Sequence, residues 1–139
     1  YCLKYGNYLL GGNAKVVTAQ VNNIAGFEVE MFGSATMVNE NGIVVQLAFG
    51  MDNDYKCDVE IWGSKGTITS GRILTAPSGF VPSYTIKKNQ KIETRNFPTD
   101  DAFLKSILRF VDCIESEVSC KEEYEILHTQ EALVEQFKD

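Results

Sequence analysis

Residues 32–49 have the sequence FGSATMVNENGIVVQLAF, and this stretch decides the class of the fold. Two runs rich in apolar and β-branched residues, at 32–38 and 43–49, flank Asn39-Glu40-Asn41-Gly42. Asn-Gly is among the strongest short signals for a β-hairpin, because both residues tolerate the positive φ angles of a type I′ turn. The stretch therefore predicts an antiparallel hairpin that turns at Asn41-Gly42.

Other segments also have the composition of β-strands. Residues 15–21 are rich in β-branched side chains and close at Asn22-Asn23. Residues 57–62 alternate between polar and apolar side chains, which predicts a strand with Asp58 and Glu60 facing water. The other expected strands lie at residues 27–30, 67–69, 84–86 and 92–94, of which the last two pair in a polar hairpin.

Helical periodicity occurs at both ends of the chain. Residues 1–10 carry leucines and tyrosines at helical spacing, and Gly11-Gly12 is a natural stop for such a helix. Pro98-Thr99-Asp100-Asp101 is a start signal for a helix that reaches residue 115. Ser119 with Glu122 resembles a capping box, which predicts the start of a last helix. The apolar stripe of the helix at 101–115 consists of Phe103, Leu104, Ile107, Leu108, Val111 and Ile114.

The order of these elements predicts an α+β fold. A helix, about six mostly antiparallel strands and two further helices favour an open sheet with helices packed on one face. No internal repeat, low-complexity tract or linker interrupts the 139 residues, so we expect residues 1–139 to form one domain.

The composition narrows the possible functions. Thirteen Lys and Arg residues against nineteen Asp and Glu give a net charge of −6, which argues against a nucleic-acid or anionic-membrane surface. No apolar run approaches the ~20 residues that span a bilayer. The chain starts at Tyr1 with neither an initiator Met nor a secretory signal, so we interpret it as a piece of something longer.

The cysteine pattern favours reduced thiols. Four cysteines occur without any C-x-x-C pair, and with a single histidine they offer no obvious ligand set for zinc. An even cysteine count also admits a disulfide interpretation, but the spacing suggests no scaffold. Cys57 and Cys113 lie in apolar segments and are expected to be small buried hydrophobes. We therefore expect a cytoplasmic protein.

Motifs for phosphate binding and catalysis are scarce. Neither G-x-G-x-x-G nor G-x-x-x-x-G-K-[ST] occurs, so this chain does not itself cradle a nucleotide phosphate. Gly63-Ser64-Lys65-Gly66-Thr67 lacks the required spacing and predicts a plain hairpin turn. His128 is interpreted as a histidine on the surface of the last helix rather than as a general base. No metal site is expected.

Several segments, in order, resemble the glucose–fructose oxidoreductase / inositol dehydrogenase (Gfo/Idh/MocA) family. Residues 1–11 resemble the family helix that follows an Asp-x-Gly-x-Tyr (or His) signature and ends in Leu-Leu-Gly. Residues 35–47 resemble its central hairpin, and residues 59–68 its strand, G-[ST]-[KE]-G-[TS] turn and strand. The helix from Asp101 to Glu115 is similar to the family's penultimate helix.

This resemblance implies the C-terminal substrate-binding and oligomerisation domain of a two-domain oxidoreductase. An N-terminal Rossmann domain, absent from this chain, would bind NAD or NADP, so no cofactor is expected here. The substrate would be a sugar, cyclitol or nucleotide sugar, and Tyr1 falls at the family's catalytic Tyr or His. A tyrosine hydroxyl can give a proton to a developing alkoxide, and a lysine ammonium of the Rossmann domain would assist. Taken alone, Tyr1 is only a terminal aromatic residue.

Residues 71–78 resemble, more loosely, an Arg-x-Phe-Thr-x-Pro segment of nucleotide-sugar 3-ketoreductases in this family. The resemblance implies that Arg72 pairs with a substrate diphosphate, for which a guanidinium fork is well shaped. The alternative is a solvent-exposed arginine at a strand edge.

Two functional hypotheses follow. The first is a part of a sugar-type dehydrogenase that is inactive alone and that forms homo-oligomers through the open face of its sheet. The second is a non-catalytic binding or dimerisation module. Neither hypothesis includes a nucleic-acid or membrane partner.

Overall fold

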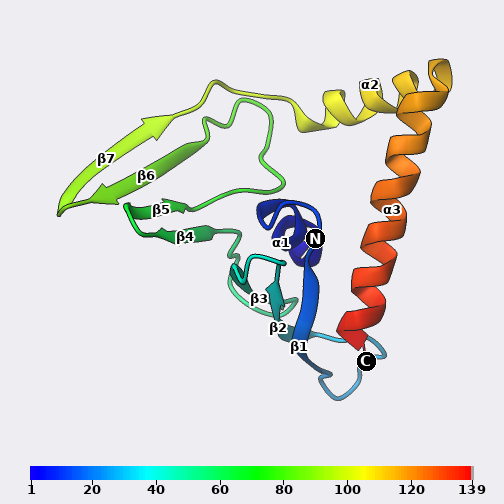
Figure 1. The fold of residues 1–139 in the computed structure, drawn as a ribbon, viewed down its shortest axis with the longest axis horizontal. Helices are drawn as coiled ribbons and strands as arrows, with labels where there is room; N and C mark the ends of the chain where they lie inside the picture. The colour runs from blue at the N-terminus through cyan, green and yellow to red at the C-terminus, as the bar shows by residue number, and fades with distance from the viewer. Residues whose placement is uncertain (139) are drawn as a thin grey trace. The chain divides into compact units, whose positions relative to one another are not determined.

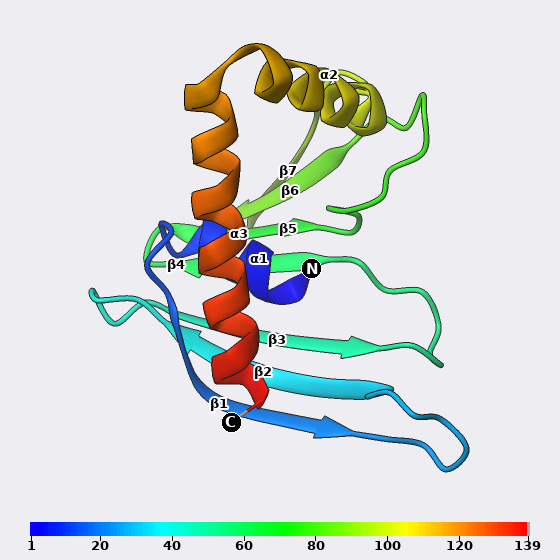
Figure 2. The same cartoon turned by 90° about the vertical axis from the view of Figure 1, so that its right-hand side faces the viewer.

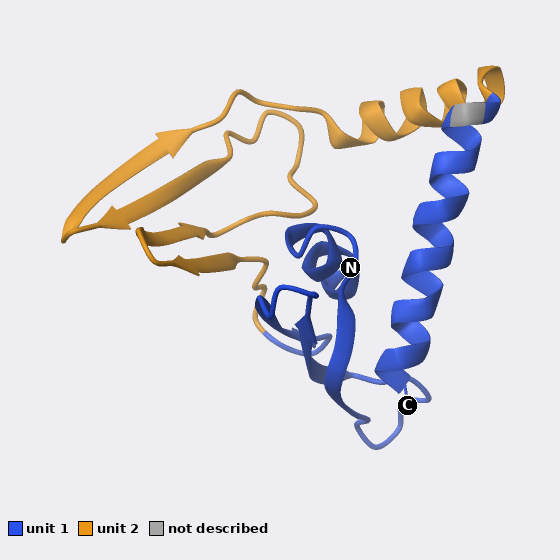
Figure 3. Ribbon diagram, viewed as in Figure 1, with its two compact units in different colours: residues 1–53, 117–139 blue, residues 54–116 orange. Residues whose placement is uncertain are grey.

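The computed structural model describes residues 1–138, except for the side chain of Val118 (Figure 1). The chain divides into two compact units (Figure 3). The first comprises Tyr1–Asn53 and the segment from Glu117 onward, and the second comprises Asp54–Ser116. The first unit is thus completed by the last helix, which returns from the far end of the sequence.

The first unit begins with α1 (Cys2–Leu9), which ends as its sequence predicts. The Gly12 N–H donates to the Asn7 carbonyl at 2.9 Å and the Gly11 N–H to the Tyr8 carbonyl at 3.2 Å. This pair of bonds is a Schellman motif, and it requires the left-handed backbone that Gly11 adopts at φ 90°. The glycine pair therefore stops the helix by a specific geometry.

Three antiparallel strands follow in the order β1-β2-β3 (Figure 2). They are β1 (Lys15–Asn22), β2 (Phe32–Val38) and β3 (Val44–Gly50). The hairpin between β2 and β3 is confirmed, with Val38 paired to Val44. Its turn differs from the predicted type I′, because only Gly42 has a positive φ, at 73°.

Asn39 explains this turn. Its side-chain oxygen accepts the N–H groups of Asn41 and Ile43, each at 3.0 Å, and its carbonyl accepts the Gly42 N–H. The Asn39 amide also donates to the Leu10 carbonyl at the end of α1. Side-chain bonds of this kind compete with a plain two-residue turn, so the hairpin gains a longer loop and a tie to the helix.

The core of the first unit lies between this sheet and two helices (Figure 2). Leu3 and Leu10 of the α1 segment, Met37 of β2 and Leu133 of α3 (Glu117–Lys138) form one buried cluster. Met37 has no exposed surface and Leu133 is 2% exposed. Full burial of side chains of this size contributes about 1.5–3 kcal/mol each. Helices α1 and α3 therefore cover the same face of the sheet, as predicted.

The second unit contains a four-stranded antiparallel sheet in the order β4-β5-β6-β7. The predicted turn at Gly63–Gly66 joins the first two strands, and the predicted polar hairpin is formed by the last two. Asn89 and Gln90 form its tip with φ angles of 49° and 64°, the pattern of a type I′ turn. These strands are β4 (Val59–Gly63), β5 (Gly66–Ser70), β6 (Ser83–Lys88) and β7 (Lys91–Asn96).

The α+β class with open antiparallel sheets is confirmed, although the seven strands form two sheets rather than one. Residues 51–54 bend the chain after β3, and the Asn53 side chain fills the space beside Gly50 where a side chain would lie. Asp52-Asn53-Asp54 has the composition of a turn, but a turn alone does not show that the strands on either side of it belong to different sheets.

Helix α2 (Ala102–Glu115) begins at the predicted position, where the Asp101 side chain accepts the Leu104 N–H at 2.9 Å. The predicted start of the last helix at Ser119 is wrong, because α3 begins at Glu117. Ser116 alone separates the two helices, in an extended conformation. This one extended residue ends α2, and α3 begins at the following residue.

Two other expectations are corrected. Residues 27–30 form bends and not a strand, since the chain there turns back from β1 toward β2. Cys57 and Cys113 are half-buried rather than buried, and all four cysteines are free thiols. The Cys57 thiol donates to the Leu74 carbonyl at 3.7 Å, so it makes a polar contact.

Candidate functional site

Tyr1 lies in the first unit, directly before α1. Its carbonyl accepts the Tyr5 N–H at 3.0 Å and so belongs to the first turn of the helix. Its side chain is 88% exposed. The residue therefore has a fixed backbone position, while no described residue encloses its ring.

Arg72 lies in the second unit, just after β5, where it forms an isolated bridge with Cys57. Its guanidinium carbon lies 4.9 Å from the ring centre of Tyr55 and 5.7 Å from that of Phe80. Both distances fall in the range of cation–π attraction. The predicted alternative of an arginine free in solvent is wrong, because the guanidinium is held by two aromatic rings.

Hydrogen bonds fix the Arg72 side chain further. The Arg72 Nη2 donates to the Thr75 carbonyl at 2.8 Å, and the hydroxyls of Tyr55 and Thr75 lie 3.2 Å apart. Thr75 itself has a φ of 49°, a strained conformation for a β-branched residue. The Nε of Arg72 is buried without a partner among the described residues. Arg72 thus organises the segment 71–80 and still has donor capacity to spare.

The four-stranded sheet presents two different faces. On one face, strand pairing aligns Ile61, Ile68 and Ile86. On the other face, it aligns one row of Glu60, Thr69, Thr85 and Thr94, and a second row of Trp62, Thr67, Lys87 and Ile92. We call the second face the Trp62 face.

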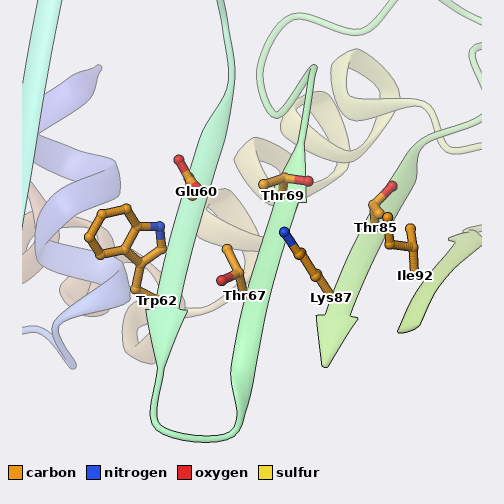
Figure 4. Close-up of a pocket in the computed structure, with 7 residues that line it drawn as sticks. All are labelled: Glu60, Trp62, Thr67, Thr69, Thr85, Lys87 and Ile92. Carbon is orange, nitrogen blue, oxygen red and sulfur yellow. The ribbon is translucent and has the colours of Figure 1, made fainter. Parts of the chain in front are cut away.

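The Trp62 face holds a shallow depression of about 320 Å³ (Figure 4). Trp62 is 81% exposed, although a tryptophan on a sheet usually packs against something. Thr85, which lines the depression, has its hydroxyl 3.1 Å from the Thr94 hydroxyl on the neighbouring strand. Glu60 and Lys87 supply opposite charges on the same surface. An exposed aromatic ring among hydroxyls and charges is typical of a ligand-binding or protein-binding surface.

The shifted pKa values lie elsewhere. Hydrogen bonding and charge attraction from Arg95 hold the pKa of Glu93 below its usual range, and the same pair raises the pKa of Arg95. A hydrogen bond from Lys105 lowers the pKa of Asp100. These groups are fully exposed ion pairs, so the shifts reflect surface pairing and mark no catalytic site.

His128 is on the surface of α3, as predicted. Its Nδ1 lies 3.6 Å from a carboxylate oxygen of Glu131, one turn along the same helix. Within residues 1–138, no three His, Cys, Asp or Glu side chains gather in a way that would hold a metal ion. None of the described helices is both long and apolar enough to cross a membrane.

The sequence profile of the GFO/IDH/MocA C-terminal domain matches residues 1–69. Residues 1–69 belong to the Gfo/Idh/MocA family. This confirms the resemblance seen in the helix at residues 1–11 and in the two hairpins that follow. The match covers the first unit up to Asn53 together with β4 and most of β5.

Curated relatives of this chain are bacterial sugar reductases. It is 28% identical over 114 residues to a dTDP-3,4-didehydro-2,6-dideoxy-alpha-D-glucose 3-reductase of Actinomadura kijaniata, and the match covers 82% of this chain. It is 26% identical over 110 residues to the 3-reductase of that name from Saccharopolyspora spinosa, covering 79% of this chain. The chain spans only about a third of these relatives, 34% and 33% of their lengths.

The solved structures extend the likeness to nearly every residue. A crystal structure of a 3-ketoreductase from Actinomadura kijaniata, in complex with TDP-benzene and NADP, matches 99% of this chain with a TM-score of 0.93 and 28% identity. This chain covers 44% of that one. Further structures of the same reductase carry a tyrosine replaced by phenylalanine or a lysine replaced by alanine.

Two parts of the site were not predicted from the sequence. The partners of Arg72, Tyr55 and Phe80, are separated from it along the chain, and no periodic pattern links them. The sequence could have placed Glu60 and Trp62 on one face of the sheet, because they alternate with Ile61 along the strand. Only the pairing register, however, brings Lys87 beside Thr67.

Proposed function

We propose that this chain is the C-terminal, substrate-binding domain of an NADP-dependent oxidoreductase that reduces the keto group of a nucleotide-linked sugar. The observation that carries the proposal is the TM-score of 0.93 over 99% of the chain with a 3-ketoreductase in complex with TDP-benzene and NADP. The curated relatives, whose names specify a dTDP-linked keto sugar, support the same substrate class.

The cofactor would be held outside this chain. The described residues contain no glycine-rich turn that opens a helix, the element that binds dinucleotide phosphates. They therefore do not fit NADP by themselves, and we assign its binding to an N-terminal Rossmann domain of the full-length protein. When bound, NADPH supplies the hydride for a carbonyl carbon.

Tyr1 would supply the proton. As a hydride reaches the carbonyl carbon, the carbonyl oxygen becomes an alkoxide, and the Tyr1 hydroxyl can donate its proton to that oxygen. The Schellman stop and the bond from Asn39 fix the far end of α1, while the Tyr1 carbonyl fixes its first turn. Tyr1 is thus presented from a fixed helix, and its 88% exposed ring is open to a substrate.

Arg72 would bind the diphosphate of the nucleotide sugar. The nearby Tyr55 and Phe80 rings and the bond to the Thr75 carbonyl restrain its guanidinium before any ligand arrives, which lowers the entropy lost on binding. A guanidinium and a diphosphate form charge-assisted hydrogen bonds with good geometry. Arg72 would then distinguish a nucleotide sugar from a plain sugar.

A homo-oligomer would form through the Trp62 face. This face presents an exposed tryptophan, a row of threonines and the opposite charges of Glu60 and Lys87. Because Glu60 and Lys87 carry opposite charges, this surface would suit a two-fold contact with a second copy of itself. We place the oligomer in the cytoplasm, in line with its reduced cysteines.

A turnover assay tests this proposal. The full-length parent is given NADPH or NADH with free sugars, inositols and dTDP-linked keto sugars. The proposal expects NADPH-dependent reduction of the dTDP-linked keto sugar. Failure to bind either dinucleotide and absence of turnover would instead favour a non-catalytic binding module.

A second assay tests the assignment of Arg72. Arg72→Met keeps an unbranched apolar stem beside the two rings and removes the guanidinium with its charge. We expect weaker binding of the dTDP-linked sugar, with unchanged binding of a plain sugar. The matched control is Arg95→Met, because Arg95 is paired with Glu93 on the surface. Equal affinity of wild type and Arg72→Met for the nucleotide sugar would show that Arg72 does not bind the diphosphate.

A further inference from the structure

Thr75 lies in the second unit, in the segment that follows β5, and its backbone is unusual. Its φ angle is 49°, in the left-handed region that a β-branched residue rarely adopts. A conformation of this kind persists only where the surrounding contacts hold it, and such residues concentrate at functional sites. The contacts of Thr75 therefore indicate which role the strained backbone has.

Thr75 contacts two residues of the second unit through different groups. Its carbonyl accepts a hydrogen bond from Arg72 Nη2 at 2.8 Å, and its hydroxyl lies 3.2 Å from the Tyr55 hydroxyl. The guanidinium carbon of Arg72 in turn lies 4.9 Å from the centre of the Tyr55 ring. The three residues thus form a closed cycle of contacts, in which Thr75 holds Arg72 directly and also holds the ring beside it.

Backbone bonds bring the members of this cycle together. The Ile73 N–H donates to the Cys57 carbonyl at 2.9 Å, next to the bridge between Cys57 and Arg72. The segment of Tyr55 therefore lies beside that of Arg72 without help from the two hydroxyls. Loss of either hydroxyl should change the position of the guanidinium and leave the pairing of the segments intact.

We propose that Thr75 is a positioning residue for Arg72: its strained turn and its hydroxyl contact with Tyr55 hold the guanidinium in the orientation that binds a diphosphate. This inference rests on the proposed function, since it takes Arg72 as the residue that contacts the diphosphate. The Thr75 carbonyl accepts one of the five N–H groups that a guanidinium carries. The remaining N–H groups of Nη1 and Nη2 stay available to phosphate oxygens, so Thr75 orients the guanidinium without blocking it.

The identity of the residue at position 75 supports a role in positioning. Glycine and asparagine are the usual residues at a positive φ, because they adopt it with little strain. Threonine is strained at this φ, but it carries the hydroxyl that meets the Tyr55 hydroxyl. A residue that only turned the chain would not need that hydroxyl, whereas a residue that positions Arg72 through Tyr55 does.

Calorimetric titration of the full-length protein with dTDP tests the inference. Thr75→Val keeps the β-branched shape and removes the hydroxyl, whereas Thr75→Ser keeps the hydroxyl. We expect Thr75→Val to bind dTDP about fivefold more weakly than the wild type, as for the loss of one hydrogen bond. Thr75→Ser should bind dTDP nearly as well as the wild type. Wild-type affinity of Thr75→Val would overturn the inference.

Combined variants show whether Thr75 acts through Tyr55 and Arg72. Tyr55→Phe removes the other hydroxyl, so it should weaken dTDP binding as Thr75→Val does, and the double variant should be no weaker than either single variant. In an Arg72→Met background, Thr75→Val should have no further effect. An equal loss in both backgrounds would overturn the inference. Thr129→Val is the control, because it removes a hydroxyl that bonds the Glu125 carbonyl on α3.

Thr75→Gly separates positioning from a purely structural role. Glycine adopts a φ of 49° without strain, so the urea denaturation midpoint should stay close to that of the wild type or rise. The affinity for dTDP should nevertheless fall at least as much as in Thr75→Val, because the hydroxyl contact is lost. Affinity and midpoint that fall together would assign Thr75 a structural role and overturn the inference.

Nitrogen-15 NMR of the Arg72 guanidinium without ligand separates this inference from the proposed function. Rotation about the Nε–Cζ bond should be slow in the wild type and faster in Thr75→Val and Tyr55→Phe. If this difference is found and the wild type does not bind dTDP, Thr75 remains the positioning residue of Arg72 and the diphosphate assignment is wrong. If Arg72→Met weakens dTDP binding while Thr75→Val leaves the rotation unchanged, the diphosphate assignment stands and the inference is wrong.

Discussion

A methyl group added to Gly6 of α1 would lie only 2.7 Å from the sulfur of Met37 in β2. Met37 has no exposed surface, and Gly6 is itself buried. The helix therefore approaches the sheet so closely that only glycine fits at this position. The pair determines how deeply α1, and with it the Tyr1 backbone, is seated on the three-stranded sheet.

The first prediction follows from this contact. Gly6→Ala gains about 1 kcal/mol of helix propensity but overpacks a fixed core, which typically costs about 1–3 kcal/mol. We expect a net loss of up to about 2 kcal/mol in the free energy of unfolding, measured by urea denaturation. In a Met37→Ala background the space is free, so Gly6→Ala should become stabilising. No change of sign between the two backgrounds would contradict the account.

The second prediction concerns the turn between β4 and β5. A Cβ on Gly66 would lie 2.5 Å from the Lys87 carbonyl oxygen, and Gly66 has a φ of 150°. Gly66→Ala should therefore lower the free energy of unfolding by about 2–4 kcal/mol. Gly63→Ala is the matched control, because its Cβ would meet only the Gly66 carbonyl at 3.6 Å. Equal denaturation midpoints for the two variants would show that the β5–β6 approach is not tight.

The third prediction concerns the start of α2. A hydrogen bond from Lys105 lowers the pKa of Asp100, so Lys105→Gln should raise that pKa toward its ordinary value. Since the folded-state pKa is depressed, the pair stabilises the fold above the unfolded pKa of about 3.9 and loses this effect as pH falls through the folded value. A carbon-detected NMR titration of Asp100 measures the change. Lys121→Gln on α3 serves as the control and should leave the titration of Asp100 where it was.

The fourth prediction tests the Trp62 face. Trp62→Glu adds a carboxylate beside Glu60 and removes the large ring, so light scattering of the full-length protein should show a smaller oligomer. Lys65→Glu, at the exposed turn between β4 and β5, should keep the oligomer intact. If the Trp62→Glu oligomer has the same mass as the wild-type oligomer, self-association uses another surface.

Local signals predicted most of the fold. Gly11-Gly12, Asp101 and the alternation around Ile61 act within a few residues of themselves, so the sequence is enough to place the elements that they start, stop or orient. The division into two sheets was not predictable, because the composition and periodicity of single strands do not show which strands pair with one another. The turn type predicted for residues 39–42 was wrong, because the Asn39 side chain accepts the backbone N–H groups of Asn41 and Ile43.

The candidate site was less predictable than the fold. The roles of Tyr1 and Arg72 were inferred from the resemblance to a family, and nothing in their neighbouring residues distinguishes them. The rings of Tyr55 and Phe80 meet at Arg72 only because the bridge between Cys57 and Arg72 brings distant segments together. Contacts of this range require the strand register, which hydrophobic periodicity does not supply.

The most direct test of the reductase assignment is a comparison of Tyr1→Phe with Tyr8→Phe in the full-length protein. Both tyrosines are highly exposed in the α1 segment, at 88% and 79%. NADPH oxidation is measured with a dTDP-linked 3-keto sugar, together with the affinity for that sugar. We expect Tyr1→Phe to lower kcat by about 100-fold or more with little change in binding, while Tyr8→Phe stays near wild type. Equal kcat values for wild type and Tyr1→Phe, or no NADPH oxidation by the wild type, would contradict this expectation.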